Sequence, residues 1–438
     1  MVREPRARHT EARPGGAWNG RGARATLAAP MKLHLVPALA LVLAAACQTP
    51  DYGRPLPEGA PALLKLGKGE KRPDFKASWG DRDELLPALE RSIEWYGRPS
   101  SKEHFPIEGV THARALESLK HFRKLLTTCT DERDFDASVA LDFEIYKSAG
   151  WNAKGGGVLF TGYCTPILPG SMTADADYRW PLFGLPDDLV KGQDGEILGQ
   201  KQSDGSLAPY PTRAAIEASS MLAGRNLELV YLKDPLDAFV AHVNGSAVIE
   251  LEDGSERRFG YAGKNGREYV SLGKMLVKDG HIKASEVSLA TIREWGAKNP
   301  ELLLEYINKD DSFVFFTEIY GDPKGSLNVD VTGGRTLATD KSLFPRGGIV
   351  FVDVDVPDRN SPLNWFQRLF TKEDQAYGSA VYDRFMFDQD TGGAIRTAGR
   401  ADIYMGIGPE AEWTAGRTKS PGQMYYLFVK DEALQSRR

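Results

Sequence analysis

Helical periodicity dominates the first part of the chain. In "DELLPALERSIEWYG" (83–97) and "THARALESLKHFRKLL" (111–126), apolar residues recur at intervals of three and four, so they line one face of a helix. We therefore predict helices over 82–97, 108–128 and 133–148.

A second pattern follows, in which short runs of β-branched and aromatic residues are separated by turns that contain glycine. Many short strands with Gly turns favour a β-barrel, so we predict a mainly β protein with helices near its N-terminus. The predicted order is a strand at 158–164, a loop-rich stretch at 165–212, a helix at 213–222, strands at 227–232, 237–251 and 257–263, a helical stretch at 284–307 broken at Pro300, and a mostly β remainder.

The N-terminus departs from both patterns. Residues 1–30 are rich in Arg, Gly and Pro and cannot build a core, whereas Leu35–Ala46 is an uninterrupted apolar run. Twelve residues are too few to span a bilayer and are typical of a signal-peptide core.

Cys47 ends this apolar run. "LAAAC" (43–47) resembles a bacterial lipoprotein cleavage box in which Cys47 is the lipidated residue, and Gln48 beside it favours the outer membrane. An ordinary secretory signal is the alternative, because Ala44 stands where a large aliphatic residue is usual. We expect a lipoprotein of the cell envelope that faces the periplasm.

Charge and cysteine content narrow the function. Residues 1–46 carry a net charge of +5, which leaves −10 for the remainder of a chain whose total is −5. An acidic body argues against nucleic acid as a partner.

Cys129 and Cys164 can form a disulfide after export, or remain two buried free thiols.

Candidate chemistry rests on carboxylates. The histidines form no HExxH motif and no Ser nucleophile elbow is present, so we expect no metal and no cofactor. In "DTGGAIRTAGRADIYMG" (390–406), Asp402 precedes Ile403 and Tyr404, and apolar neighbours raise a carboxyl pKa toward the range of a general acid. Asp390 precedes a Gly pair, where its carboxylate would accept backbone N–H bonds and stay ionised. Structural turn or barrel aspartates are the alternative reading.

Six ordered blocks stand out along the chain: "LFTGYCTPILPGS" (159–171), "DAFVAHVNGSAVIELEDG" (237–254), "GYAGKNGREYVSLGKML" (260–276), "SFVFFTE" (312–318), "GGRTLATDKSLFPRGGIVFV" (333–352) and "DTGGAIRTAGRADIYMGIGPEAEWTAGR" (390–417). Together they resemble the membrane-bound lytic murein transglycosylase A family with its three-aspartate domain. The resemblance spans about 155–430.

The resemblance implies a double-psi β-barrel interrupted by a second, β-rich domain, with a substrate groove between them. The implied division is an N-terminal extension and signal at 1–47, a linker at 48–80, helices and the first barrel segment at 81–167, the inserted domain at 168–311, barrel completion with the three-aspartate domain at 312–430, and a tail at 431–438.

The implied reaction cleaves the bond between muramic acid and glucosamine in peptidoglycan glycan strands and closes a 1,6-anhydro ring. Asp402 would serve as acid and base, and Asp390 would orient or bias it. The residues implied to contact sugar are Tyr163, Thr165, Gly245, Ser246, Lys264 and Asn265. Packing or turn roles are the alternative for Asp390 and these six, and "KNG" at 264–266 can also be a hairpin tip.

Three departures from the family pattern stand out: Cys164 for a second Tyr, Asn244 for Gln and Thr397 for Gly. The first two are expected to alter sugar contacts. Two other functions stay open. An inverting hydrolase would use Asp402 as acid and Asp390 as base across a water-sized gap. A non-catalytic peptidoglycan-binding lipoprotein would not need a buried Asp402.

Overall fold

The computed structural model describes residues 50–192, 197–219, 221–284, 286–361, 363 and 377–435. The predicted signal segment and Cys47 lie outside these residues. Within the described part of the chain, no helix is long and apolar enough to cross a membrane.

Six strands close into a barrel. The strands pair in the order β18-β3-β17-β13-β16-β14, and β14 pairs again with β18, which completes the ring. Two of the pairings, β3–β17 and β13–β16, are parallel. This closed mixed barrel confirms the predicted fold class. Its strands are β3 (Val158–Thr165), β13 (Thr336–Ala338), β14 (Ile349–Asp358), β16 (Arg384–Asp390), β17 (Arg400–Ile407) and β18 (Lys419–Val429).

Alternation of side chains explains why these segments form barrel strands. In β14, Val352, Val354 and Val356 are buried while Asp353 and Asp355 between them are exposed, as a strand with one buried face requires. Three outer strands extend the barrel sheet: β1 (Leu63–Lys65), β2 (Phe143–Ser148) and β15 (Gly378–Val381).

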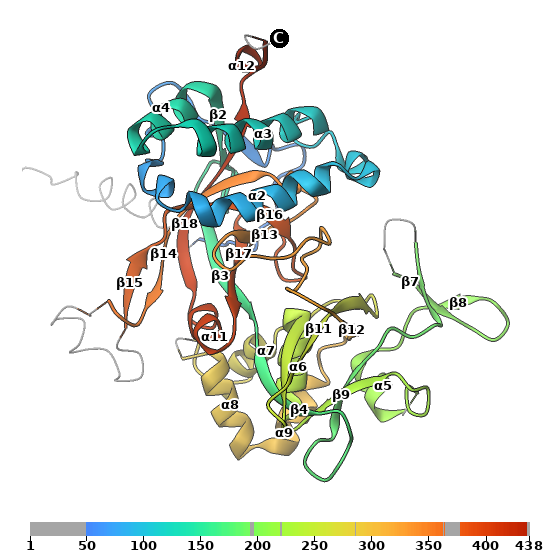
Figure 1. Ribbon diagram of the computed structural model, residues 1–438. Coiled ribbons are helices and arrows are strands. Elements are labelled where there is room, and N and C mark those ends of the chain that lie inside the picture. Colours follow the sequence, from blue (N-terminus) through green and yellow to red (C-terminus); the bar gives the residue numbers. More distant parts are fainter. Residues whose placement is uncertain are drawn as a thin grey trace, which may run out of the picture. The chain divides into compact units, whose positions relative to one another are not determined.

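Three helices pack against the barrel: α2 (Arg82–Tyr96), α3 (His112–Thr128) and α4 (Glu132–Asp142) (Figure 1). Their buried faces share one apolar cluster with the barrel strands, in which Phe122 of α3 lies 4.7 Å from Phe385 of β16 between ring centroids. Side-chain caps begin two of them, since Thr111 accepts from the Arg114 N–H and Asp131 from the Arg133 N–H. The periodic pattern therefore identified real helices.

A second sheet lies between β3 and β13 in the sequence. Its order is β12-β11-β10-β4-β9-β5, so the inserted segment is β-rich as predicted. The strands are β4 (Ile167–Ser171), β5 (Trp180–Phe183), β9 (Glu228–Leu232), β10 (Ser246–Leu251), β11 (Glu256–Lys264) and β12 (Val314–Glu318). A smaller sheet contains β6 (Leu189–Lys191), β7 (Ile197–Lys201) and β8 (Leu207–Ala208), and the helices are α5 (Arg213–Ala218), α6 (Pro235–Asn244), α7 (Leu272–Lys278), α8 (Leu289–Lys298) and α9 (Pro300–Ile307). The predicted break at Pro300 separates α8 from α9.

Two secondary-structure predictions are wrong. Residues 237–244 were predicted as strand but lie in α6, whose start is fixed by Asp234 as N-cap and Pro235 in the first turn, and whose end is fixed by Gly245. The predicted helix 133–148 ends at Asp142, because the remaining residues form β2 and pair with β18. Long-range pairing overrides local propensity there.

Three other predictions need correction. The segment 312–318 was assigned to barrel completion, but β12 pairs with β11 in the second sheet. The predicted linker contains β1, which pairs with β2. The stretch 165–212, predicted as loop-rich, contains five short strands, β4 to β8. For β12, β1, β4 and β5 the partner strand lies far away in the sequence, whereas β6, β7 and β8 pair locally with one another.

Candidate functional site

Asp402 lies on β17 at the centre of three adjacent barrel strands. Its backbone is in register with Thr161 of β3 on one side and Ala338 of β13 on the other. Ile403 and Tyr404 beside it are buried. No hydrogen-bond partner among the described residues reaches the buried Oδ1 of Asp402. One carboxyl oxygen is therefore left without a hydrogen bond from the described residues.

Burial raises the pKa of Asp402 to about 7. A hydrogen bond from Thr161 and the charge of Arg400 lower that pKa, and the charge of Asp390 raises it. Arg400 Nη2 also donates to Thr161 Oγ1 at 3.1 Å, so Thr161 connects the guanidinium to the carboxyl. Near neutral pH this carboxyl can both donate and accept a proton.

Asp390 ends strand β16 and is separated from Asp402 by the short strand β13, in which Ala338 is in register with both. Tyr163 Oη donates to Asp390 Oδ2 at 2.6 Å. The backbone N–H groups of Ser326 and Thr391 donate to Oδ1, both at 2.8 Å. These three hydrogen bonds lower the pKa of Asp390, but burial is the largest effect and raises it above its usual value. The expectation that the turn keeps Asp390 ionised is therefore opposed by desolvation, which outweighs the hydrogen bonds.

A hydroxyl network joins the barrel to the second sheet beside these carboxyls. Thr165 Oγ1 lies 2.9 Å from Ser246 Oγ of β10 and 2.9 Å from Tyr404 Oη. The rings of Tyr163 and Tyr404 pack at 5.1 Å between centroids. Thr165 is fully buried, so its hydroxyl positions its neighbours instead of meeting solvent.

Gly245 and Asn265 are two further residues that were predicted to contact sugar. Gly245 directly precedes Ser246 and adopts a left-handed φ of 69°, which a side chain would strain. Asn265 is buried, and its side chain bonds four backbone groups, those of Pro211, Asp311, Phe313 and Arg267. Its amide is fully used inside the inserted segment.

Lys264 ends strand β11 in register with Val314 of β12, so it is not the tip of a hairpin. Within the described residues, neither Lys264 nor Asn265 forms a hydrogen bond or ion pair with Asp390 or Asp402. Of the predicted residues, Tyr163 donates directly to Asp390, and Thr165 and Ser246 are linked to it through Tyr404, whose ring packs on Tyr163.

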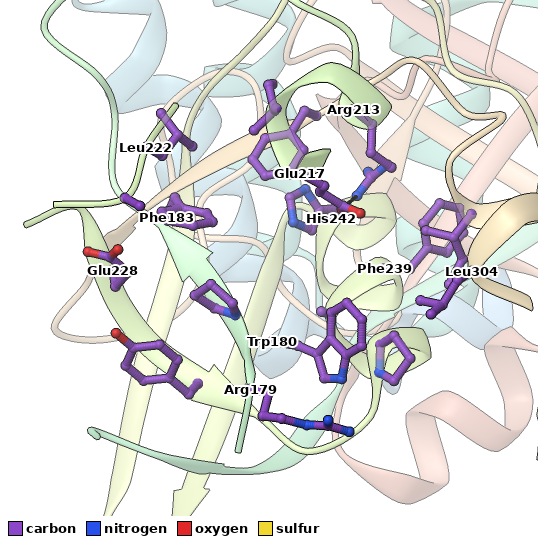
Figure 2. A pocket seen from close by; sticks show the side chains of 18 residues that line it. Arg179, Trp180, Phe183, Arg213, Glu217, Leu222, Glu228, Phe239, His242 and Leu304 are labelled. Atoms are coloured by element: carbon purple, nitrogen blue, oxygen red, sulfur yellow. Dashed lines mark hydrogen bonds and ion pairs between the residues drawn. The ribbon is translucent and has the colours of Figure 1, made fainter. Parts of the chain in front are cut away.

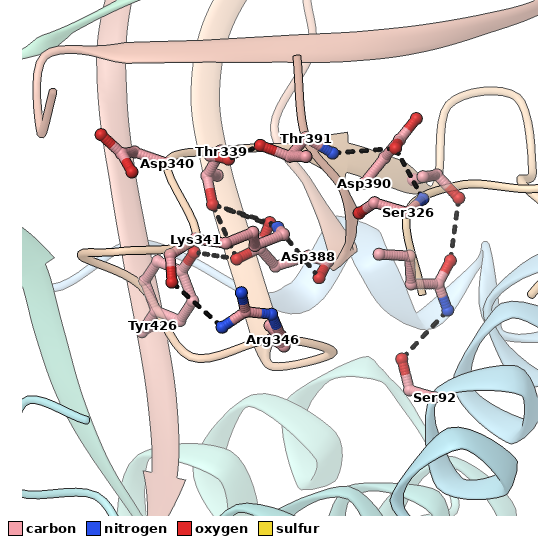
Figure 3. Close-up of polar contacts among 12 residues, drawn as sticks. Ser92, Ser326, Thr339, Asp340, Lys341, Arg346, Asp388, Asp390, Thr391 and Tyr426 are labelled. Carbon is pink, nitrogen blue, oxygen red and sulfur yellow. Dashed lines mark hydrogen bonds and ion pairs between the residues drawn. The ribbon is translucent and has the colours of Figure 1, made fainter. Parts of the chain in front are cut away.

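A buried charge pair below Asp390 was missed by sequence reasoning. Lys341 Nζ contacts Asp388 Oδ1, and both side chains are buried (Figure 3). Asp388 also accepts from Thr339 Oγ1 and, at 2.8 Å, from Tyr426 Oη. The available signal was a second aspartate two residues before Asp390, in "FDQD" (387–390). The charge of Lys341 lowers the pKa of Asp390.

Family departures also have local explanations. Cys164 faces away from Tyr163 and packs against Ala411 and Ala415 of α11 (Pro409–Ala415). Both Cys129 and Cys164 are free thiols, so the disulfide alternative is wrong. The Asn244 amide donates to the Val240 carbonyl within α6. Neither departure places a changed side chain on the carboxyls.

Comparisons with known proteins agree with this geometry. Residues 159–317 match the MltA specific insert domain and residues 335–428 match the 3D domain. The Membrane-bound lytic murein transglycosylase A of Escherichia coli (strain K12) is 32% identical over 284 residues, which cover 63% of this chain and 68% of that relative.

Solved structures show the same fold. The membrane-bound lytic murein transglycosylase from Agrobacterium tumefaciens matches with a TM-score of 0.66 at 24% identity, over 86% of this chain and 100% of that one. Escherichia coli MltA with bound chitohexaose matches with a TM-score of 0.61 at 24% identity, over 87% and 96% of the two chains. From the barrel, its carboxyl site and these matches, we conclude that the chain belongs to the membrane-bound lytic murein transglycosylase A family.

Proposed function

We propose that this protein cleaves the β-1,4 bond between muramic acid and glucosamine with Asp402 as its single acid and base. As a member of its family it is a lytic murein transglycosylase, an enzyme that acts on peptidoglycan. One observation carries the finer proposal: Asp402 has a pKa of about 7 and a buried carboxyl oxygen without a protein partner. A group that must give a proton and then regain it works best when its pKa lies near the working pH.

The reaction balances without water. Protonated Asp402 gives its proton to the bridging oxygen, and the bond from that oxygen to the anomeric carbon breaks. The Asp402 carboxylate then takes the proton of the muramoyl 6-hydroxyl, while the oxygen of that hydroxyl bonds to the anomeric carbon. The product ends in a 1,6-anhydro ring, and Asp402 is protonated again.

Asp390 has a different role in this proposal. Both of its carboxyl oxygens already accept hydrogen bonds, from Tyr163, Ser326 and Thr391. A carboxylate so occupied is poorly suited to take a proton from water, which disfavours the inverting hydrolase. Its charge instead raises the pKa of Asp402 and helps to keep the acid protonated.

The glycan is proposed to lie in a groove between the barrel and the inserted sheet. The hydroxyl chain from Thr165 to Ser246 marks where the two meet. The bound chitohexaose in Escherichia coli MltA, a chain of N-acetylated sugars, supports a glycan strand as ligand. We further propose that the protein belongs to the cell envelope, as its membrane-bound relatives do, and that Cys47 anchors it in the outer membrane.

Product analysis of peptidoglycan digestion tests the reaction. Asp402→Asn keeps the shape of the side chain but cannot carry the proton, so turnover should fall by ~10²–10⁴. Asp390→Asn, the matched control, should cost less. An anhydro product is lighter by one water than a reducing end and takes no label from heavy-oxygen water. Label in the product would establish hydrolysis, and an active Asp402→Asn would remove the proposed acid.

A further inference from the structure

An apolar cavity of about 310 Å³ lies wholly within the inserted segment, and none of the residues proposed for glycan cleavage lines it. The aromatic side chains of Trp180, Phe183 and Phe239 line it (Figure 2), as does Phe313, and all 18 lining residues lie between Arg179 and Phe313. Its volume equals that of about ten water molecules at ~30 Å³ each. This is the lower end of the range for small-molecule sites.

A buried guanidinium faces this cavity. The Arg213 side chain is only 2% exposed and lies 5.2 Å from the ring centroids of both Phe239 and Phe313. Its Nη2 donates to the Ser312 carbonyl at 2.7 Å. No acceptor among the described residues reaches its Nε. A buried donor without a partner is costly, so a ligand atom that accepts from it would be stabilised.

A second donor lies beside it. His242 is buried, and its ring packs on Phe313 at 4.4 Å between centroids. Its Nδ1 accepts the Val314 N–H at 3.0 Å, which leaves the proton on Nε2. Burial holds the pKa of His242 well below its usual value, so the ring is neutral. Two N–H donors therefore accompany the aromatic side chains, and the other charged residues that line the cavity are Arg179, Glu217 and Glu228.

Charge balance limits the ligand further. Carboxylates already face Arg213, with Glu217 at 3.5 Å and Asp310 at 3.9 Å. An anionic ligand would have to compete with them inside a poorly solvated space, and a cationic ligand would meet the guanidinium. A neutral molecule avoids both costs.

We propose that this cavity is a second ligand site, which binds a small neutral molecule that has an apolar ring and one carbonyl acceptor. The ring packs among Trp180, Phe239 and Phe313, and the carbonyl accepts from Arg213 Nε or His242 Nε2. The site is independent of Asp402 and takes no part in cleavage of the glycan.

Ligand-detected NMR on the full chain tests the site with three probes: acetanilide, toluene and benzoate. Acetanilide combines a ring with an amide carbonyl, toluene lacks the acceptor and benzoate adds a charge. We expect acetanilide to bind saturably and more tightly than either of the others. Failure of acetanilide to bind, or tighter binding of benzoate, would overturn the proposal.

Three substitutions test where acetanilide binds. Ala238→Leu fills the cavity from α6 and should abolish binding of acetanilide, whereas Ala215→Leu, on an exposed position of α5 that does not line the cavity, should leave it unchanged. Arg213→Met should weaken binding about tenfold, the worth of one hydrogen bond. Unchanged binding in Ala238→Leu would overturn the site. Because a variant can fail to fold, Overhauser contacts from the acetanilide ring to Leu304 and Ile307 methyl groups are measured in the unaltered protein, and their absence would overturn it as well.

Discussion

Two hydroxyl groups on β3 act in opposite directions on the charge of Asp402. The hydrogen bond from Thr161 lowers the pKa of Asp402 directly. Tyr163 acts through Asp390, since its hydrogen bond lowers the pKa of Asp390 and the Asp390 charge raises that of Asp402. Thr161 and Tyr163 are two residues apart on the same strand, so their side chains lie on one face of it. They therefore form a matched pair for substitution.

The acid works only while protonated, so kcat should fall as pH rises through the pKa of Asp402. Thr161→Val removes a hydrogen bond to the charged form, raises that pKa and should move the basic limb of the kcat profile up by roughly half to one pH unit. Tyr163→Phe leaves Asp390 less ionised, lowers the pKa of Asp402 and should move the limb down. Shifts in the same direction would contradict this coupling.

Thr397, one of the three departures from the pattern that the resemblance implies, has a strained backbone. Its φ is 98°, a conformation that β-branched residues rarely adopt. Three hydrogen bonds hold it there: its N–H donates to Asp340 Oδ2, its hydroxyl donates to the Tyr52 carbonyl, and the hydroxyl accepts from the Gly399 N–H.

Comparing two substitutions separates the strain from the hydrogen bonds. Thr397→Ala and Thr397→Gly both lose the hydroxyl, but only glycine relaxes at this φ. We expect the glycine variant to exceed the alanine variant in free energy of unfolding by about 1 kcal/mol, measured by urea denaturation. Equal stabilities would show that the backbone at 397 carries no strain.

At the scale of elements, one buried arginine fixes helix α2 on the barrel. Arg335 is 1% exposed, and its Nη2 lies 2.8 Å from Asp81 and 2.8 Å from Glu84 at the start of α2. Glu84 is 70% exposed, so water can replace its ion pair, whereas the arginine side chain also fills buried space.

The two partners should therefore differ in stability effect. Arg335→Ala should lower the free energy of unfolding by roughly 2–3 kcal/mol through lost packing and lost charge-assisted hydrogen bonds. Glu84→Ala should cost less than about 1 kcal/mol, as exposed ion pairs do. Thermal and urea unfolding measure both. A larger effect of Glu84→Ala would mean that the ion pair, not the packing, attaches α2.

Elements with local periodicity were predicted from the chain alone, as α2, α3 and the break between α8 and α9 show. Helix α6 was misread because "DAFVAHVN" is apolar on nearly every face, which removes the period that distinguishes helix from strand. Its Asp-Pro start and Gly end were the better signal. Strand β2 follows α4 without a breaker, and its pairing with β1 and β18 makes it a strand.

At the scale of the whole molecule, we expect attachment to the membrane to depend on the N-terminal segment. The apolar run Leu35–Ala46 ending at Cys47 motivates a lipid anchor, and more than one acyl chain is needed to hold a protein stably. Cys47→Ser should move the protein from the membrane fraction to the soluble periplasmic fraction, with peptidoglycan cleavage retained. A substituted protein that still sediments with membranes would contradict lipidation at Cys47.

The sequence by itself determined the N-terminal helices, the strand-rich remainder and a carboxyl beside apolar residues at 402, because these depend on neighbouring positions and their period. Tertiary structure decided the rest. Ring closure needs the pairing of β14 with β18, and β13 separates the two aspartates. The desolvation of Asp402 comes from atoms remote in the chain, and so do two of the three donors to Asp390, those of Tyr163 and Ser326. The hydrogen bonds from the Asn265 side-chain amide to Pro211 and Asp311 likewise join distant residues. A pKa and a hydrogen-bond partner are properties of the surrounding space, which local pattern does not contain.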